Sequence, residues 1–141
     1  MEILENVLSI DKMKHLQELG VNTGNASMTW MLYPYEEGKQ PQLSLREWKT
    51  FKEPFRKEHC IPAFTLLDIL ELLPKEIKIG TDTYWITMYF SDNCWHICYS
   101  MSDEFDYYQE FLSYSLIDAS YEMLCWCIKN GYVKVRKEEQ L

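Results

Sequence analysis

The spacing of apolar residues predicts three helices, over residues 10–19, 65–73 and 115–130. In each range apolar side chains recur every three or four positions, the period that places them on one face of a helix. A residue that can cap the first turn stands at the start of each range, and a Gly or Pro ends it. These pairs are Ser9 and Gly20, Thr65 and Pro74, and Ser115 and Gly131.

Runs rich in β-branched and aromatic residues predict strands between these helices. The segment 91–93, Ser-Asp-Asn, separates two such runs and predicts a three-residue hairpin turn. The predicted strands cover residues 28–33, 42–48, 84–90 and 94–101.

The segment before the second helix is the most ambiguous part of the chain. Residues 42–48 alternate in the manner of a strand, but Ser44 with Glu47 could equally open a helix. Residues 49–59 are mostly polar and interrupted by Pro54, which predicts an irregular connection.

The order of these elements predicts an α+β fold in one domain, residues 1–141, with a short flexible tail at about 136–141. Two helix-plus-hairpin units followed by a helix can form one antiparallel sheet of about four strands, with the helices packed on one face. The predicted order is therefore helix, hairpin, helix, hairpin, helix.

Charge is distributed unevenly and changes the range of possible partners. The chain has a formal net charge of −8, and residues 79–128 contain no Lys or Arg at all. Binding to nucleic acid or to anionic lipid needs basic side chains, so both are disfavoured. We therefore expect no nucleic-acid partner and no membrane partner.

The same sequence predicts a cytoplasmic protein. Its first residues carry acidic side chains where a secretory signal has basic ones, and its most apolar stretch is too short to span a bilayer. The chain has five cysteines, an odd number that favours free thiols in a reducing compartment.

The segment 101–111 is the candidate binding region, because four acidic residues alternate there with four aromatic ones. We expect a solvated loop in which aromatic rings anchor a partner and carboxylates attract it. A basic cluster over residues 46–57 could also meet this acidic surface on a second copy, so self-association is possible. The residues expected to contact a basic protein are Asp103, Glu104, Phe105, Asp106, Tyr108 and Glu110.

An enzymatic alternative depends on Cys94, His96 and Cys98, which fall on one face of a predicted strand. A strand rises about 3.3 Å per residue, so the two thiols lie roughly 13 Å apart, too far to share one zinc ion. No nucleotide-binding glycine motif is present, and no cofactor is predicted. Elemental analysis separates the two hypotheses, because stoichiometric zinc favours the enzyme.

Six runs of the chain carry a resemblance to known proteins, namely residues 13–21, 26–28, 61–70, 73–75, 121–128 and 130–132. These runs resemble a family of small uncharacterised proteins from gut anaerobes of the Bacteroides group and their phages or mobile elements. The resemblance implies cytoplasmic residence and an accessory role, and it carries over no activity, cofactor or catalytic residue. Residues 33–60 and 92–114 match nothing specific in that family.

Together these observations predict a non-enzymatic module that binds a basic protein through an acidic-aromatic face. A narrower hypothesis is an inhibitor or immunity-type protein, in which carboxylates occupy the positions of nucleic-acid phosphates on the enzyme that it blocks. The alternative from another class is a small thiol- or metal-dependent enzyme.

Overall fold

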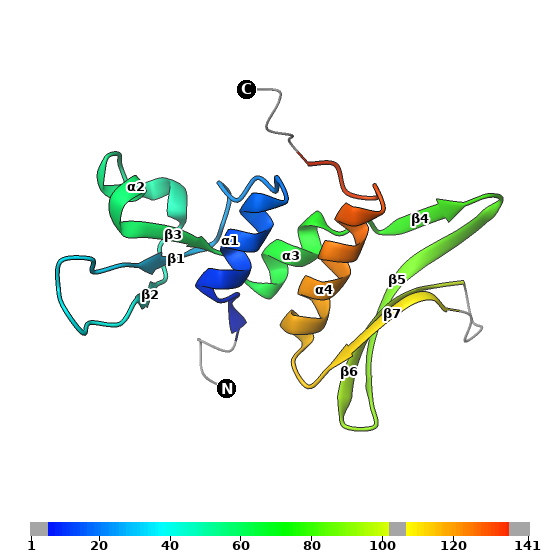
Figure 1. The fold of residues 1–141 in the computed structure, drawn as a ribbon. Coiled ribbons are helices and arrows are strands. Elements are labelled where there is room, and N and C mark those ends of the chain that lie inside the picture. Colours follow the sequence, from blue (N-terminus) through cyan, green and yellow to red (C-terminus); the bar gives the residue numbers. More distant parts are fainter. Residues whose placement is uncertain (1–5, 102–106, 136–141) are drawn as a thin grey trace. The chain divides into compact units, whose positions relative to one another are not determined.

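A computed structural model of the chain describes residues 6–101 and 107–135. The described residues form two compact units, residues 6–68 with 135, and residues 69–101 with 107–134. Each unit contains its own antiparallel sheet, of three strands in the first and four in the second (Figure 1). The structure is α+β, but the predicted architecture is wrong, because one sheet with helices packed on one face is not formed.

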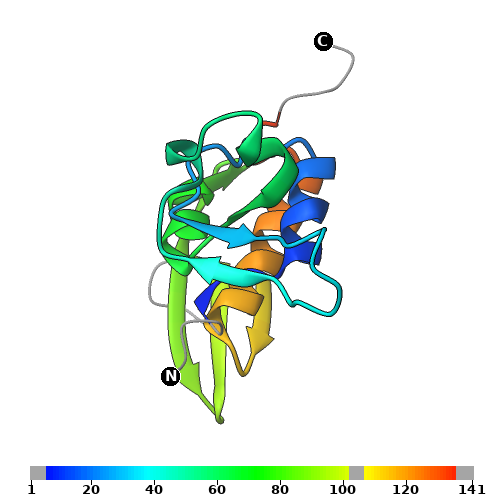
Figure 2. The same cartoon turned by 90° about the vertical axis from the view of Figure 1, so that its left-hand side faces the viewer.

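The first unit is built on a sheet with strand order β2-β1-β3. Strands β1 and β2 form an antiparallel pair and lie alongside each other in Figure 2. Helix α1 packs against β3, and so does the short helix α2. The elements that begin in this unit are α1 (Ile10–Glu18), β1 (Met28–Met31), β2 (Gln42–Ser44), the 3₁₀ turn η2 (Trp48–Thr50), α2 (Phe55–His59), β3 (Cys60–Ala63) and α3 (Leu66–Leu72).

Helix α1 forms as its sequence predicts. The Ser9 side chain caps the helix by accepting a hydrogen bond from the Lys12 backbone N–H at 3.2 Å. Gly20 follows the helix with a φ of 94°, a left-handed conformation that glycine adopts without steric cost. Met13 and Leu16, one turn apart, are fully buried and form the apolar face.

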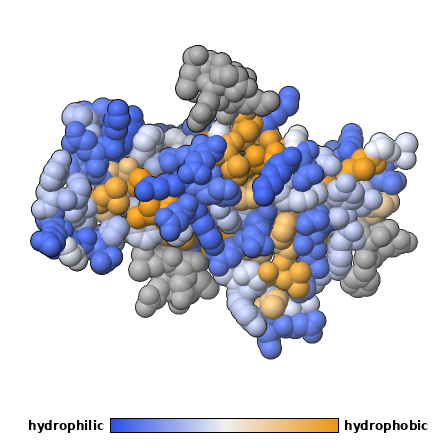
Figure 3. Space-filling model, viewed as in Figure 1, coloured by the Kyte–Doolittle hydropathy of each residue, from blue (hydrophilic) through white to orange (hydrophobic). Residues whose placement is uncertain are grey.

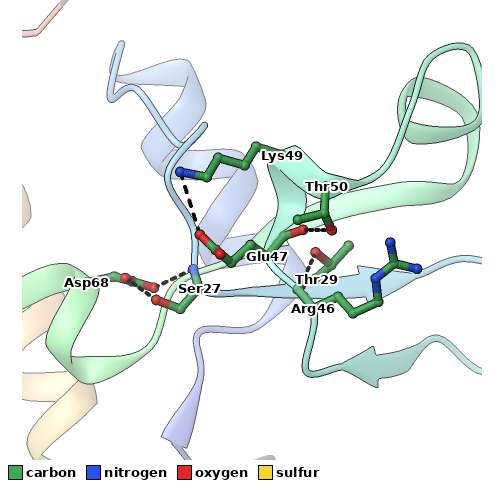
Figure 4. Close-up of polar contacts among 7 residues, drawn as sticks. All are labelled: Ser27, Thr29, Arg46, Glu47, Lys49, Thr50 and Asp68. Atoms are coloured by element: carbon green, nitrogen blue, oxygen red, sulfur yellow. Dashed lines mark hydrogen bonds and ion pairs between the residues drawn. The ribbon is translucent and has the colours of Figure 1, made fainter.

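Asp68 fixes the start of α3 and ties it to the chain before β1 (Figure 4). The Thr65 backbone N–H donates to the Asp68 carboxylate at 2.9 Å, and the Asp68 N–H donates to the Thr65 hydroxyl at 3.2 Å. This reciprocal pair is the predicted capping box. The same carboxylate accepts hydrogen bonds from the Ser27 N–H at 3.0 Å and the Ser27 hydroxyl at 2.6 Å.

The structure departs from the sequence prediction at three places within residues 42–63. The connection predicted over residues 49–59 is partly helical, because α2 forms after Pro54. Strand β3 was not predicted, since it contains Pro62, which has no N–H to donate to a neighbouring strand. The sheet accommodates Pro62 because β3 is an edge strand, paired on one side only. Strand β2 is also shorter than the predicted strand over residues 42–48.

The second unit is a meander of four antiparallel strands in the order β4-β5-β6-β7, followed by a long helix. Strand β4, which was not predicted, has only four residues and alternates acidic, apolar and basic side chains. Figures 1 and 2 show β5 and β6 as a long hairpin. The elements are β4 (Glu76–Ile79), β5 (Asp82–Ser91), β6 (Cys94–Ser100), β7 (Tyr107–Ser113) and α4 (Leu116–Lys129).

The turn between β5 and β6 is shorter than predicted. Ser91 pairs with Cys94, which leaves two residues, Asp92 and Asn93, in the turn. Their φ angles are 54° and 61°, the signature of a type I′ turn, which matches the twist of the flanking strands. Asn and Asp tolerate this left-handed conformation better than most residues do.

Helix α4 packs on one face of the second sheet, as its apolar positions predict. The Ser115 side chain caps the helix, and Gly131 follows it with a φ of 79°. The Trp126 ring lies 6.4 Å from the ring of Tyr99 in β6 and 5.9 Å from that of Tyr108 in β7. Tyr99 is fully buried and donates a hydrogen bond to the Pro74 carbonyl at 2.7 Å. Among the described residues, no helix has the length and apolarity that crossing a membrane requires.

Candidate functional site

The predicted binding region is only partly visible. Asp103, Glu104, Phe105 and Asp106 lie outside the described residues. Residues 107–113 form strand β7, so the part of the predicted loop that can be described is a strand of the second sheet. The sequence reading missed this strand because its residues, Tyr-Tyr-Gln-Glu-Phe-Leu-Ser, do not alternate cleanly between apolar and polar.

The structure places Tyr108 and Glu110 on opposite faces of that sheet. The Tyr108 ring contacts Trp126 of α4 and lies 5.2 Å from the Tyr84 ring, and 43% of the residue is exposed. Glu110 pairs with Cys98 and turns away from α4. The two residues therefore do not form one contact surface.

Glu110 belongs to a polar cluster on the face opposite α4. Its carboxylate accepts a hydrogen bond from the Tyr89 hydroxyl at 3.0 Å, and the Tyr89 and Tyr107 hydroxyls are 2.8 Å apart. The His96 ring stacks on Tyr89 with centroids 4.4 Å apart and planes 8° apart. Because this carboxylate is engaged within the protein, its main effect is to hold β5, β6 and β7 together.

The cluster contains Ser91, His96 and Glu110 in the order of a catalytic triad, but its geometry does not support nucleophilic catalysis. His96 Nε2 is shared between the Ser91 hydroxyl at 3.2 Å and the Ser91 carbonyl at 3.3 Å. His96 Nδ1 lies 3.4 Å from Glu110 Oε2, close enough for an ion pair, but the atom makes no hydrogen bond. A proton relay needs an aligned hydrogen bond at each nitrogen. The arrangement instead anchors the end of the β5–β6 hairpin.

The thiol alternative is weakened by burial. Cys98 is fully buried, and burial together with the nearby Glu110 carboxylate raises the pKa of its thiol to about 11. A thiol with that pKa is almost entirely protonated at neutral pH and is a poor nucleophile or metal ligand. Within residues 6–101 and 107–135, no group of three or more His, Cys, Asp or Glu side chains is arranged to hold a metal ion.

The feature that the sequence analysis missed is a set of exposed apolar side chains on the β5–β6 hairpin. Met88 is 40% exposed and Phe90 is 56% exposed. Side chains on a strand alternate between faces, and the cross-strand partners of these two residues are Ile97 and Trp95, on the face that carries Tyr99. The Phe90 ring meets the edge of Trp95 with centroids 5.3 Å apart. Apolar surface lies above the polar turn of this hairpin in Figure 3.

Strands β5, β6 and β7, around the apolar pair Met88 and Phe90, contain no Lys or Arg. Strands β5, β6 and β7 include Asp82 and Glu110, and Asp92 lies in the exposed turn. Interfaces are enriched in aromatic residues and Met and depleted in Lys. This part of the second unit therefore has the composition of a protein-binding surface with a negative charge.

Comparisons with known proteins found no match to a family model, to a curated protein or to a solved structure.

Proposed function

We propose that this protein acts by binding a basic partner protein through the β5–β7 part of its second unit. The observation that carries the proposal is the exposed apolar pair, Met88 and Phe90, on strands that lack Lys and Arg. Exposed apolar side chains supply contact area, and the exposed Asp92 carboxylate in the adjoining turn attracts positive charge. Catalysis is not part of this proposal.

The cellular setting of the proposal is the cytoplasm. None of the five cysteines forms a disulfide and four of them are buried, which suits a reducing compartment. The resemblance to proteins of Bacteroides-group bacteria and their mobile elements supports an accessory role. An inhibitor or immunity-type protein is the narrower form of the same proposal.

Affinity capture with matched variants tests the proposal. The wild type, a Met88→Ala/Phe90→Ala variant and a Tyr35→Ala/Leu67→Ala control are used as baits in a lysate of the native host. The control removes two side chains that are at least as exposed but belong to the first unit, at 86% and 64%. We expect the wild type and the control to capture the same basic protein and the first variant to lose it.

Two outcomes contradict the proposal. Equal capture by all three baits removes the apolar pair from the binding surface. Loss with the control alone assigns binding to the first unit. Circular dichroism of each variant verifies that the fold is retained, as expected for substitutions at exposed positions.

A further inference from the structure

Strand β5 extends well past the strand that covers its outer edge. It has ten residues whereas β4 has four, and their pairing ends where Trp85 meets Glu76. One more bond follows, from the Ile86 N–H to the Lys75 carbonyl at 3.0 Å. Beyond it, none of the residues that the structure describes pairs with Thr87–Ser91 on this side. We call this stretch, Thr87–Ser91, the open β5 edge.

The backbone groups at this edge belong to the apolar pair. Successive residues of a strand direct their N–H and C=O groups to opposite sides. Because the Ile86 N–H points toward β4, the N–H and C=O groups of Met88 and Phe90 point to the same side, where β4 has ended. Thr87, Tyr89 and Ser91 direct theirs to β6. The open edge therefore offers main-chain hydrogen bonds beside two exposed apolar side chains.

Other sheet edges of the described strands carry features that discourage pairing, and this one does not. Charges, Pro, bulges and short length are the usual protections. Strand β3 has Pro62, β2 has three residues, β4 is short and carries Lys78, and β7 carries Glu110 beside a register shift at Tyr99/Ser100. The open β5 edge is Thr-Met-Tyr-Phe-Ser, with no charge and no Pro.

We infer that the open β5 edge binds an extended segment of the partner protein, which adds a strand to the second sheet. The inference rests on the proposed function and specifies how the partner docks. Main-chain hydrogen bonds to Met88 and Phe90 supply affinity, and alternate side chains supply specificity. On the α4 face the segment meets Met88 and Phe90 and needs apolar residues.

Charge selects the other half of the segment. On the opposite face the segment meets Thr87 and Tyr89, and the Tyr89 hydroxyl donates a hydrogen bond to the Glu110 carboxylate. Strands β5, β6 and β7 contain no Lys or Arg, and Lys78 of β4 pairs with Thr83 near the other end of β5. The exposed Asp92 lies in the turn at the end of the open edge, so a basic side chain there meets a carboxylate. The segment that fits is therefore one of alternating apolar and basic residues. A second copy of the chain offers an uncharged strand instead and lacks this complementarity.

Hydrogen exchange at individual amides tests the inference, with an acetylated hexapeptide of alternating Leu and Lys as the probe. In the free protein the amides of Met88 and Phe90 are expected to exchange fast, whereas Tyr89, bonded to β6, is protected. With the alternating peptide, exchange at Met88 and Phe90 is expected to slow about ten-fold or more. A peptide of the same composition in two blocks, three Leu and three Lys, is the matched control and is expected to change neither.

Edge substitutions separate backbone from side-chain effects. Met88→Pro removes one outward N–H without removing a bond to β6, and we expect it to abolish peptide binding. Met88→Ala keeps that N–H and is expected to retain slowed exchange at Phe90. Protection of the Tyr89 amide verifies in both variants that the hairpin is folded, and Phe90→Pro serves as a second edge variant.

Three results overturn strand addition. The first is protection of the Met88 and Phe90 amides in the free protein, and the second is unchanged exchange with the alternating peptide. The third is protection that appears only as protein concentration rises, because this indicates pairing with a second copy. If capture is lost in Met88→Ala/Phe90→Ala but is unaffected by Met88→Pro, the proposed function holds and strand addition fails. If capture is unaffected by all of these variants, the proposed function itself fails.

Discussion

At the scale of single residues, burial controls the chemistry of the cysteines. Cys60, Cys98, Cys125 and Cys127 are buried, and only Cys94, beside the β5–β6 turn, is partly exposed. Burial is also the main cause of the raised pKa values of Cys60, Cys98 and Cys127. The thiolate is the reactive form, so the accessible thiol and the inert thiols are separated by position in the fold.

Thiol labelling tests this separation. With a chromogenic disulfide reagent at pH 8, we expect the native protein to react rapidly at Cys94 alone, and all five cysteines to react after denaturation. Cys94→Ser is expected to remove the fast phase, whereas Cys98→Ser leaves it unchanged. Rapid labelling of Cys98 in the native protein contradicts the burial that we describe.

The same burial predicts a loss of stability at alkaline pH. An ordinary thiol has a pKa of 9.0, whereas burial raises the pKa of Cys98 and of Cys127 to about 11. As pH rises from 9 to 11, the unfolded chain releases these protons before the folded chain does. The free energy of unfolding therefore falls over that range, by up to about 1.4 kcal/mol per pH unit for each thiol, and has no thiol-dependent slope below pH 9.

Urea denaturation at a series of pH values measures that slope. A Cys98→Ala/Cys127→Ala variant is expected to be less stable overall but to show a flatter decline of the free energy of unfolding with pH. Tyr99, whose pKa is also raised by burial, adds its own decline at the upper end of the range. An equal slope in the wild type and the double variant is the contradicting result.

At the scale of elements, helices were easier to predict than strands because their signals are local. Ser9, Thr65 and Ser115 cap the three segments that have helical periodicity, and each cap is a contact within four residues. Strands β3, β4 and β7 were missed, since a strand is stabilised by partners far along the chain. Pro62 argues against a strand at residues 60–63, and the sheet tolerates this proline because β3 lies at a sheet edge.

The candidate site was predictable only in part for the same reason. Composition alone shows that residues 79–128 lack Lys and Arg. The division of Tyr108 and Glu110 between two faces depends on the pairing of β7 with β6 and on the register shift near Tyr99. The open β5 edge exists because β4 is short, and a strand of four residues gives too little sequence pattern to predict.

Trp126 tests the packing of α4 on the second sheet. Its ring contacts Tyr99, Tyr108 and Tyr132. We expect Trp126→Ala to lower the free energy of unfolding by about 2–5 kcal/mol, because it removes a large packed side chain and leaves a cavity. Tyr114→Ala, at a residue that is 84% exposed, is the control and is expected to change stability by less than about 0.5 kcal/mol. Equal midpoints for Trp126→Ala and the wild type contradict this packing.

At the scale of the whole molecule, the proposed binding requires negative charge to attract a basic partner to the apolar pair. Glu110 is engaged in the polar cluster, so the carboxylates of Asp103, Glu104 and Asp106 are the ones to neutralise. Once a partner is captured, Asp103→Asn/Glu104→Gln/Asp106→Asn is expected to slow association and weaken its dependence on salt, since exposed charges are screened over about 10 Å at 0.1 M ionic strength.

A triple variant in the first unit, Asp11→Asn/Glu18→Gln/Glu37→Gln, alters net charge equally and is the control. We expect it to associate at nearly the wild-type rate, because steering depends on where charges lie and not only on their sum. Equal slowing in both variants indicates a general effect of net charge and removes residues 103–106 from the account.

Site-specific photo-crosslinking in the native host tests whether the apolar pair on the β5–β6 hairpin is the partner-binding surface. A photoreactive phenylalanine analogue replaces Phe90 in one sample and Tyr35, the exposed aromatic control in the first unit, in the other. The account predicts one dominant crosslinked product from position 90, containing a basic protein joined through an extended segment, and none from position 35. No product from position 90, or the same products from both positions, contradicts it.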